Sequence, residues 1–262
     1  MEFLATAATD KDTLRRIAMS ASEDWIRAVL LAHEVFRHQL IEHHWDTVRN
    51  MIFSPDVIGR TSVSWTERVM HAVDQLDLLD FRLDESSRRI VCHYLQRWVR
   101  QVMDPMSPVE VYRSPQYGFG LRLRAGVSVK VRRKNALLDP YLDGLVVFVK
   151  EWDVQDVDRL FSIYRTRSDG RTGVLVGPLS LVNHSAQSPL AFRDCPPSKI
   201  DILASTEQKK LLCNRLWSDD HAVALSRYVW ISYERVIMCD GHRRPAEIMY
   251  PPGSPLEVHY GI

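Results

Sequence analysis

The sequence predicts an α+β fold, with an N-terminal helical subdomain over residues 1–108 and a mostly β domain over residues 109–262. Apolar residues recur at near-helical spacing from about residue 10 onward, and after Val109 they alternate with polar residues as in half-buried strands. Pro105 and Pro108 lie between the two patterns and end the helical half. A chain of 262 residues can form one large domain or two small ones.

Three stretches make up the predicted helical half. The first begins at an Asp10 or Asp12 N-cap, and the second at Ser64, with Glu67 completing a capping box three residues later. The apolar positions that predict the buried helix faces are Leu14, Ile17, Trp25, Val29, Leu30 and Val35 in the first stretch, and Ile90, Tyr94, Leu95, Trp98, Val99 and Val102 in the third. These faces indicate a helical bundle.

Alternation predicts the strands of the second half. It is clearest in "YGFGLRLRAGVSVKVRR", where the alternating apolar residues are Leu121, Leu123, Val127, Val129 and Val131. Further strands are expected in "DGLVVFV", "GVLVGPLSLV", "VALSRYVWISYERVIM" and "LEVHYGI", which Gly, Pro and Asn turns separate. The segment between Cys195 and Asp220 is expected to be irregular or partly helical.

The stretch "HEVFRHQLIEHHW" is rich in histidine and invites comparison with a zinc site. A zinc protease helix needs two histidines four residues apart, but His38 follows His33 by five, and Arg37 occupies the ligand position. Five residues are about 140° off-face in an ideal α-helix. We therefore expect histidines on the helix surface and no metal site.

The run "RLRAGVSVKVRRK" places basic residues along alternating strand positions: Arg122, Arg124, Lys130, Arg132, Arg133 and Lys134. One interpretation is the solvated face of a β-hairpin. The other is a shallow basic patch that touches phosphates or an acidic partner.

Composition sets limits on the class of protein. The chain is 45% hydrophobic and 26% charged with a formal charge of +1, so it has no global attraction to nucleic acid or membrane. Its four cysteines form no CxxC pair, which predicts reduced thiols in an intracellular protein. No apolar run is long enough to span a membrane and no secretory signal is evident, so we expect a cytoplasmic or nuclear protein.

Three motifs follow one another along the β half. A Gly-x-Gly turn at Gly118 and Gly120 begins it, an apolar strand leads into Asn183-His184-Ser185, and a Pro-Gly turn leads into a strand that ends at Tyr260. This order resembles that of the SET-domain protein lysine methyltransferases. The stretch "LVGPLSLVNH" is most similar to the histone H4 lysine methyltransferases that carry an N-terminal helical domain. The resemblance covers roughly residues 109–262 and implies a SET-like domain with a pseudoknot.

The resemblance also implies a site for S-adenosyl-L-methionine. In this family the Asn-His strand threads under the C-terminal segment and lies beside the cofactor. An asparagine amide suits such a site because it offers both donors and an acceptor, and glycines let the backbone approach a ligand closely. The implied cofactor-binding residues are Gly118, Phe119, Gly120, Asn183 and His184.

Catalysis is implied to centre on Tyr260. Methyl transfer to lysine is a direct displacement, so positioning dominates, and the amine must be neutral although its free pKa is about 10.4. Tyr164 is either a second tyrosine that lines the lysine channel or ordinary core packing. The resemblance implies a histone tail as substrate, a possible nucleosome or chromatin partner, and a nuclear location, with the cytoplasm possible.

The chain departs from the family at several places. Ala186 stands where a cysteine is usual, Pro189 is displaced by one residue, and Ser254-Pro255 replaces the usual Glu-Glu. The chain also lacks the cysteine-rich segment that follows Tyr260 in many relatives, so no zinc is expected. These departures leave two alternatives. One is a SET-like module without activity that binds a partner through its helical half, and the other is an unrelated α+β protein in which residues 118, 183 and 260 do not converge.

Overall fold

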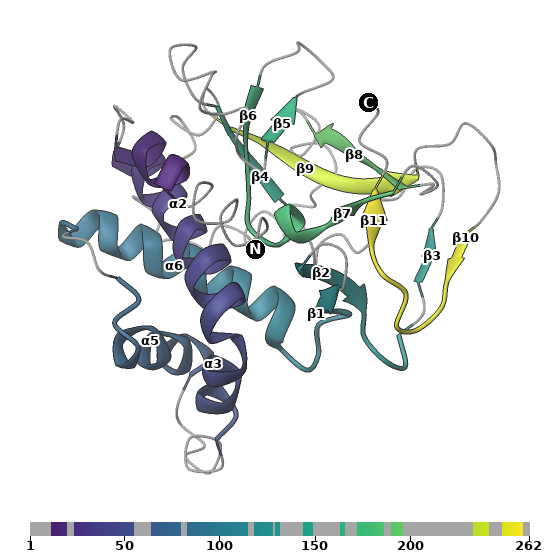
Figure 1. Cartoon of the computed structure of the whole chain (residues 1–262), viewed down its shortest axis with the longest axis horizontal. Helices are drawn as coiled ribbons and strands as arrows, with labels where there is room; N and C mark the ends of the chain where they lie inside the picture. Colours follow the sequence, from purple (N-terminus) through teal and green to yellow (C-terminus); the bar gives the residue numbers. More distant parts are fainter. Residues whose placement is uncertain are drawn as a thin grey trace, which may run out of the picture.

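The chain folds as an α+β protein in which helices gather on one side and strands on the other (Figure 1). The computed structural model describes residues 12–19, 24–54, 64–79, 83–114, 118–127, 129–131, 144–148, 163–165, 172–185, 190–195, 233–240 and 248–258. Backbone positions alone are given for some of them, Tyr164 and His184 among these. Two predicted features lie outside these ranges: the irregular segment between Cys195 and Asp220, and Tyr260, the tyrosine predicted to be catalytic.

The helical half follows the predicted pattern. Residues 12–19 form a first helix. The later helices are α2 (Asp24–Glu34), which continues as the π-helix η1 (Val35–His44) and then as α3 (Trp45–Ile52), α5 (Trp65–Gln75) and α6 (Glu85–Met103). α6 ends directly before the Asp104-Pro105 pair, as the prolines predict, since proline cannot continue the hydrogen-bond ladder.

Helix α5 begins at the predicted capping box. The Ser64 side chain accepts a hydrogen bond from the Glu67 amide, and the Glu67 carboxylate accepts one from the Ser64 amide at 2.7 Å. These bonds hold the pKa of Glu67 below its usual value. Asp84 caps α6 in the same way by accepting from the Ser87 amide at 3.0 Å.

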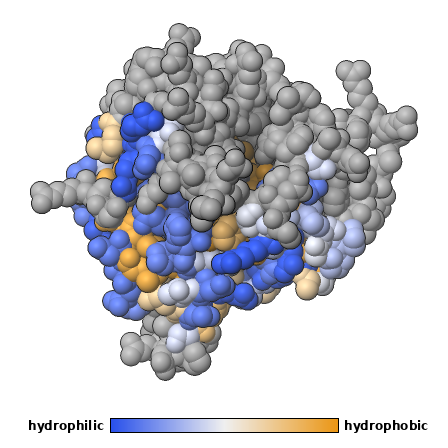
Figure 2. Space-filling view, viewed as in Figure 1, coloured by the Kyte–Doolittle hydropathy of each residue, from blue (hydrophilic) through white to orange (hydrophobic). Residues whose placement is uncertain are grey.

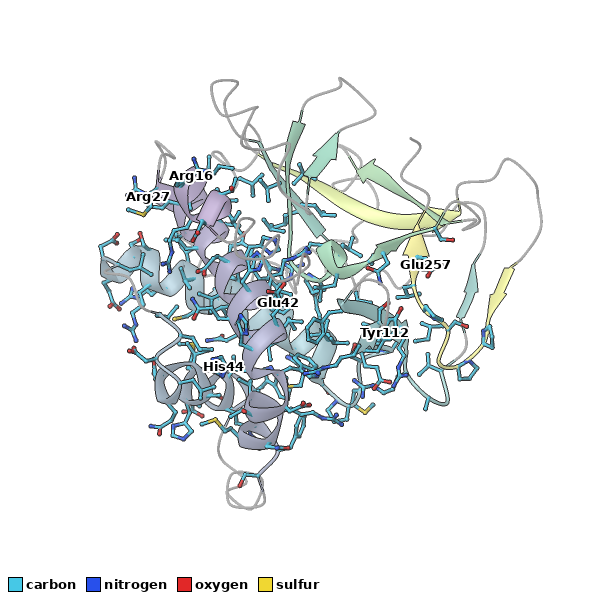
Figure 3. All side chains as sticks on the ribbon, in the orientation of Figure 1. Arg16, Arg27, Glu42, His44, Tyr112 and Glu257 are labelled. Atoms are coloured by element: carbon cyan, nitrogen blue, oxygen red, sulfur yellow. The ribbon has the colours of Figure 1, made fainter. Side chains whose placement is uncertain are left out.

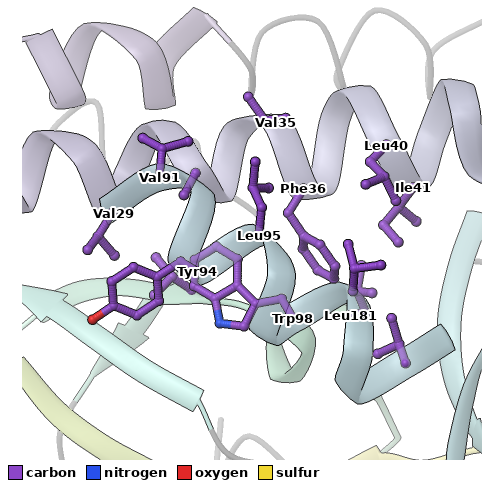
Figure 4. Close-up of a cluster of buried hydrophobic side chains, with 14 of the residues drawn as sticks. Val29, Val35, Phe36, Leu40, Ile41, Val91, Tyr94, Leu95, Trp98 and Leu181 are labelled. Atoms are coloured by element: carbon purple, nitrogen blue, oxygen red, sulfur yellow. The ribbon is translucent and has the colours of Figure 1, made fainter. Parts of the chain in front are cut away.

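The predicted buried faces meet between α2 and α6. Trp98 packs against Phe36 with ring centroids 5.7 Å apart, and Leu95 and Val29 lie beside them (Figure 4). The same buried cluster continues into the β half through Val146, Val174, Leu179 and Leu256. Both halves therefore share one hydrophobic core, to which each fully buried large side chain contributes about 1.5–3 kcal/mol.

The strands that the structure describes form four sheets. A five-stranded antiparallel sheet has the order β5-β6-β4-β9-β8. Its strands are β4 (Gly144–Phe148), β5 (Ile163–Arg165), β6 (Thr172–Val176), β8 (Leu190–Cys195) and β9 (Tyr233–Asp240). The two-stranded sheets pair β1 (Val109–Ser114) with β2 (Gly118–Leu123), β3 (Val129–Val131) with β10 (Ile248–Tyr250), and β7 (Asn183–His184) with β11 (Glu257–Val258).

The expected hairpin around the basic run is wrong. β2 pairs antiparallel with β1, and β3 pairs with β10, so the two basic strands are not partners. Leu121 and Leu123 are buried as predicted, but Arg122 and Arg124 both bind the Glu110 carboxylate, at 2.9 and 3.2 Å. This shared acidic partner offsets the positive charge of that part of the run.

The expectation of surface histidines is also wrong for two of them. His33 and His38 are 0% and 1% exposed, because α2 and η1, which carry them, both pack against α6. The spacing argument assumed α-helical geometry, whereas the chain from Val35 to His44 is a π-helix. His43 is exposed as expected.

The apolar run before Asn183 is buried but is not the single strand expected. β6 ends at Val176, Gly177 turns the chain with a φ of +83°, and a 3-10 helix follows (η3, Pro178–Leu181). We call residues 177–182 the approach turn. It carries the chain from the large sheet to β7.

The described surface is of ordinary mixed polarity. Figure 2 shows hydrophilic side chains interspersed with smaller apolar areas on one face. Within the described ranges, Met19 and Met106 are the large hydrophobic residues that are exposed. No helix among the described residues is long and apolar enough to cross a membrane.

Candidate functional site

The structure brings the first two predicted motifs into contact. A Cβ atom added to Gly120 would lie 2.5 Å from Asn183 Nδ2 and 2.8 Å from Tyr112 Cε1. Both separations are far shorter than the contact distance of about 3.5 Å between heavy atoms. Only a glycine at this position of β2 therefore lets the amide of Asn183 lie against the strand.

Among the residues that the structure describes, none accepts a hydrogen bond from the amide nitrogen of Asn183. Asn183 Nδ2 is also shielded from solvent. A buried amide left unsatisfied costs about 1–3 kcal/mol, so such groups usually have a partner. The two N–H donors of this amide are therefore available to the carbonyl, carboxylate or ring-nitrogen acceptors of a ligand.

The C-terminal segment closes one side of this position. Leu256 N donates to Leu121 O at 2.7 Å, and Leu123 N donates to Ser254 O at 2.9 Å, which fastens the segment to β2. At the next residue the same segment pairs in parallel with β7, where Glu257 lies opposite Asn183. Figure 1 shows β11 beside β7.

Tyr112 lies at the Gly120–Asn183 contact, and further aromatic and charged side chains lie on the same strands. Tyr112 lies opposite Gly120 on β1, and the Arg122 guanidinium lies 5.8 Å from the centre of its ring. On the same sheet the Arg113 guanidinium lies 5.5 Å from the centre of the Phe119 ring. Figure 3 shows Tyr112 and Glu257, which contribute an aromatic ring and a carboxylate from β1 and β11. Sequence reasoning missed Tyr112, because its place depends on the register of β1 against β2.

The predicted site residues are distributed over three strands. Gly118, Phe119 and Gly120 form the start of β2, where Gly118 has a φ of +79°, a conformation that favours glycine. Asn183 and His184 form β7. The backbone of Tyr164 lies on the edge strand β5, opposite Gly173.

Metal-ligating side chains do not gather in the part of the chain that the structure describes. No group of three or more His, Cys, Asp or Glu residues there could hold a metal ion. Cys92, on α6, is a free thiol, and burial raises its pKa. The polar groups described at the site are therefore the Asn183 amide, the Tyr112 ring, the Arg122 guanidinium and the Glu257 carboxylate.

Comparison with known proteins adds no relative. The chain matches no protein-family model, and a search of curated proteins finds no match for its sequence.

Proposed function

We propose that the chain is an S-adenosyl-L-methionine-dependent protein lysine N-methyltransferase, with a SET-like domain over residues 109–262. The observation that carries this proposal is the buried, unused donor of Asn183 against the bare backbone of Gly120. The parallel pairing of β7 with β11 supports the pseudoknot that the proposal includes.

The residues present fit the cofactor. A free buried donor is what a polar ligand edge requires, and a glycine with no space for a Cβ leaves backbone within reach of a ligand. In the proposal, Asn183 and His184 hold the cofactor together with residues 118–120. S-adenosyl-L-methionine supplies an electrophilic methyl group when it is bound.

In catalysis the chain's own residues orient the substrate lysine and favour its neutral form. The proposal assigns Tyr260, two residues beyond Val258 in the sequence, to orient the substrate lysine through its phenol oxygen. The lysine must lose its proton before it attacks, and a dry channel lowers its pKa because desolvation disfavours the charged form. Tyr164 is proposed as a second tyrosine of this channel. Placing the amine is the main source of rate in such a displacement.

The proposed substrate is a histone tail, and the proposed location is the nucleus. Mixed histones and radiolabelled S-adenosyl-L-methionine, incubated with the full chain, test both the activity and the substrate class. We expect label in a histone with the parent chain and a loss of about 100-fold with Tyr260→Phe. Tyr94→Phe is the matched control, since it removes a phenol oxygen from the helical core, and it should keep most of the activity. Equal rates for the parent chain and Tyr260→Phe would exclude the catalytic role.

A second candidate function is a SET-like module that binds a partner without transferring methyl groups. Ala186, at a position where the family has a cysteine, favours it. This alternative predicts no uptake of label and no binding of the cofactor by the parent chain.

A further inference from the structure

The turn that delivers Asn183 is bound by two side chains of the helical half. Gly177 N donates to His33 Nδ1 at 3.3 Å, and Arg37 Nη1 donates to Ser180 O at 2.9 Å. His33 and Arg37 are four residues apart on the continuous helix formed by α2 and η1. One helix thus contacts the backbone of the approach turn at two points.

His33 is suited to accept this hydrogen bond because it is neutral. Its side chain is fully buried, and burial first, then the positive charge of Arg37 and the neighbouring His38, lower its pKa well below the usual 6.5. A neutral imidazole that accepts at Nδ1 carries its proton on Nε2. His33 Nε2 has no hydrogen-bond partner among the described residues, so Nδ1 is the atom at which this buried ring gains a bond.

Trp98 confines Gly177 from another direction. A Cβ atom on Gly177 would lie 2.6 Å from Trp98 Nε1, and the φ of +83° disfavours any side chain. The His33 and Trp98 rings are perpendicular, with centroids 6.1 Å apart. Gly177 therefore lies against the indole while its amide points to the imidazole.

Internal hydrogen bonds connect the residues of the approach turn. Ser180 Oγ donates to Gly177 O at 2.7 Å, and the Ser180 amide donates to the same carbonyl at 3.1 Å. The Val182 amide donates to Leu179 O at 3.1 Å, one residue before Asn183. These bonds connect Gly177 to the residue that directly precedes β7.

We propose that His33 and Arg37 are positioning residues that fix the approach turn and, through it, the amide of Asn183. The turn-fixing role stands on the contacts above, while its consequence for cofactor binding rests on the proposed function. The helical half is then a structural part of the site and sets the distance between β7 and β2.

The test removes the acceptor of the Gly177 N hydrogen bond in one variant and restores an acceptor in a second. His33→Leu removes the acceptor and keeps the site apolar, and His33→Asn places an amide oxygen near the position of Nδ1. His38→Leu is the matched control, because it also removes a buried histidine from the same helix, where His38 Nδ1 lies 3.1 Å from Glu42 Oε2. Amide hydrogen exchange of residues 173–184 in the full chain is compared with that of α6.

We expect His33→Leu to speed exchange of residues 173–184 about tenfold relative to α6, as loss of a buried hydrogen bond permits. His33→Asn should restore most of the protection, and His38→Leu should leave the ratio unchanged. An unchanged ratio in His33→Leu, or an equal rise in His38→Leu, would overturn the proposal. Should His33→Leu fail to fold, Arg37→Met gives the same comparison at Ser180.

A binding experiment tests the role of His33 separately from the proposed methyltransferase function. With S-adenosylhomocysteine as the probe, His33→Leu should weaken binding about tenfold, and the double variant with Asn183→Ala should bind no more weakly than Asn183→Ala alone. Additive losses would mean that His33 does not act through Asn183. A parent chain that binds no probe refutes the proposed function, while the exchange ratios still decide whether His33 fixes the turn.

Discussion

Replacing Gly120 by alanine adds one methyl group at the contact between β2 and β7. The new Cβ would lie 2.5 Å from Asn183 Nδ2 and 2.8 Å from Tyr112 Cε1, so at least one of the two must retreat by about 1 Å. Such overpacking typically costs about 1–3 kcal/mol. Because Asn183 is held by its pairing with β11, we expect part of this cost as lost cofactor affinity, about 10-fold or more.

Urea unfolding measures the stability that Gly120→Ala loses, and calorimetric titration with S-adenosylhomocysteine measures the affinity that it loses. Gly126→Ala is the control: its Cβ would meet no atom within 4 Å, although its φ is +83°. It should lose about 1 kcal/mol of stability through backbone strain and keep the affinity of the parent chain. If Gly120→Ala leaves both stability and affinity unchanged, the inferred contact between Gly120 and Asn183 is refuted.

Three further predictions concern the helical half. Ser64→Ala should lower the free energy of unfolding by about 1 kcal/mol in urea denaturation, because the Glu67 amide loses its acceptor; an unchanged midpoint would exclude the capping box. Trp98→Ala should cost about 3–5 kcal/mol, since the ring is 2% exposed and central to the core, and a loss below 1 kcal/mol would contradict its burial. Burial, and then the positive charge of Arg97, lower the pKa of His93 from 6.5 to about 4. Between pH 6.5 and pH 4 the unfolded chain therefore binds more protons than the folded chain, and the free energy of unfolding falls as the pH decreases. The slope due to His93 is up to about 1.4 kcal/mol per pH unit; His93→Gln should reduce it in unfolding curves between pH 7 and pH 5, and an unaltered slope would contradict the shift.

The helices could be predicted because their caps and buried faces depend on residues close together in the sequence. The cap at Ser64 needs only Glu67 three residues later, and the buried face of α6 needs only the period of the helix. The burial of Leu121 and Leu123 likewise follows from alternation. These features depend on neighbours within a few residues in the sequence.

Strand partners could not be predicted in the same way. Alternation in the basic run suits a hairpin, yet β2 pairs with β1 and β3 with β10, because pairing depends on segments far apart in the chain. The burial of His33 has the same origin, since Trp98 and Gly177 come from other elements. Spacing along one helix does not contain this information.

The candidate site was predicted only in part. The residues Gly120 and Asn183 came from the resemblance, and their contact is a finding of the structure. No sequence motif indicates that Tyr112 lies beside these two residues. No motif indicates that His33 accepts a hydrogen bond from Gly177 N either. Both depend on strand register and on how the helical half packs against the sheet.

Calorimetric titration of the full chain with S-adenosyl-L-methionine tests the central claim most directly. We expect micromolar binding by the parent chain and a loss of about tenfold or more in Asn183→Ala, which removes the buried donor. Asn50→Ala, on an exposed position of α3, is the control and should bind as the parent chain does. No binding by the parent chain, or equal binding by Asn183→Ala, would contradict the claim that this amide forms the cofactor site.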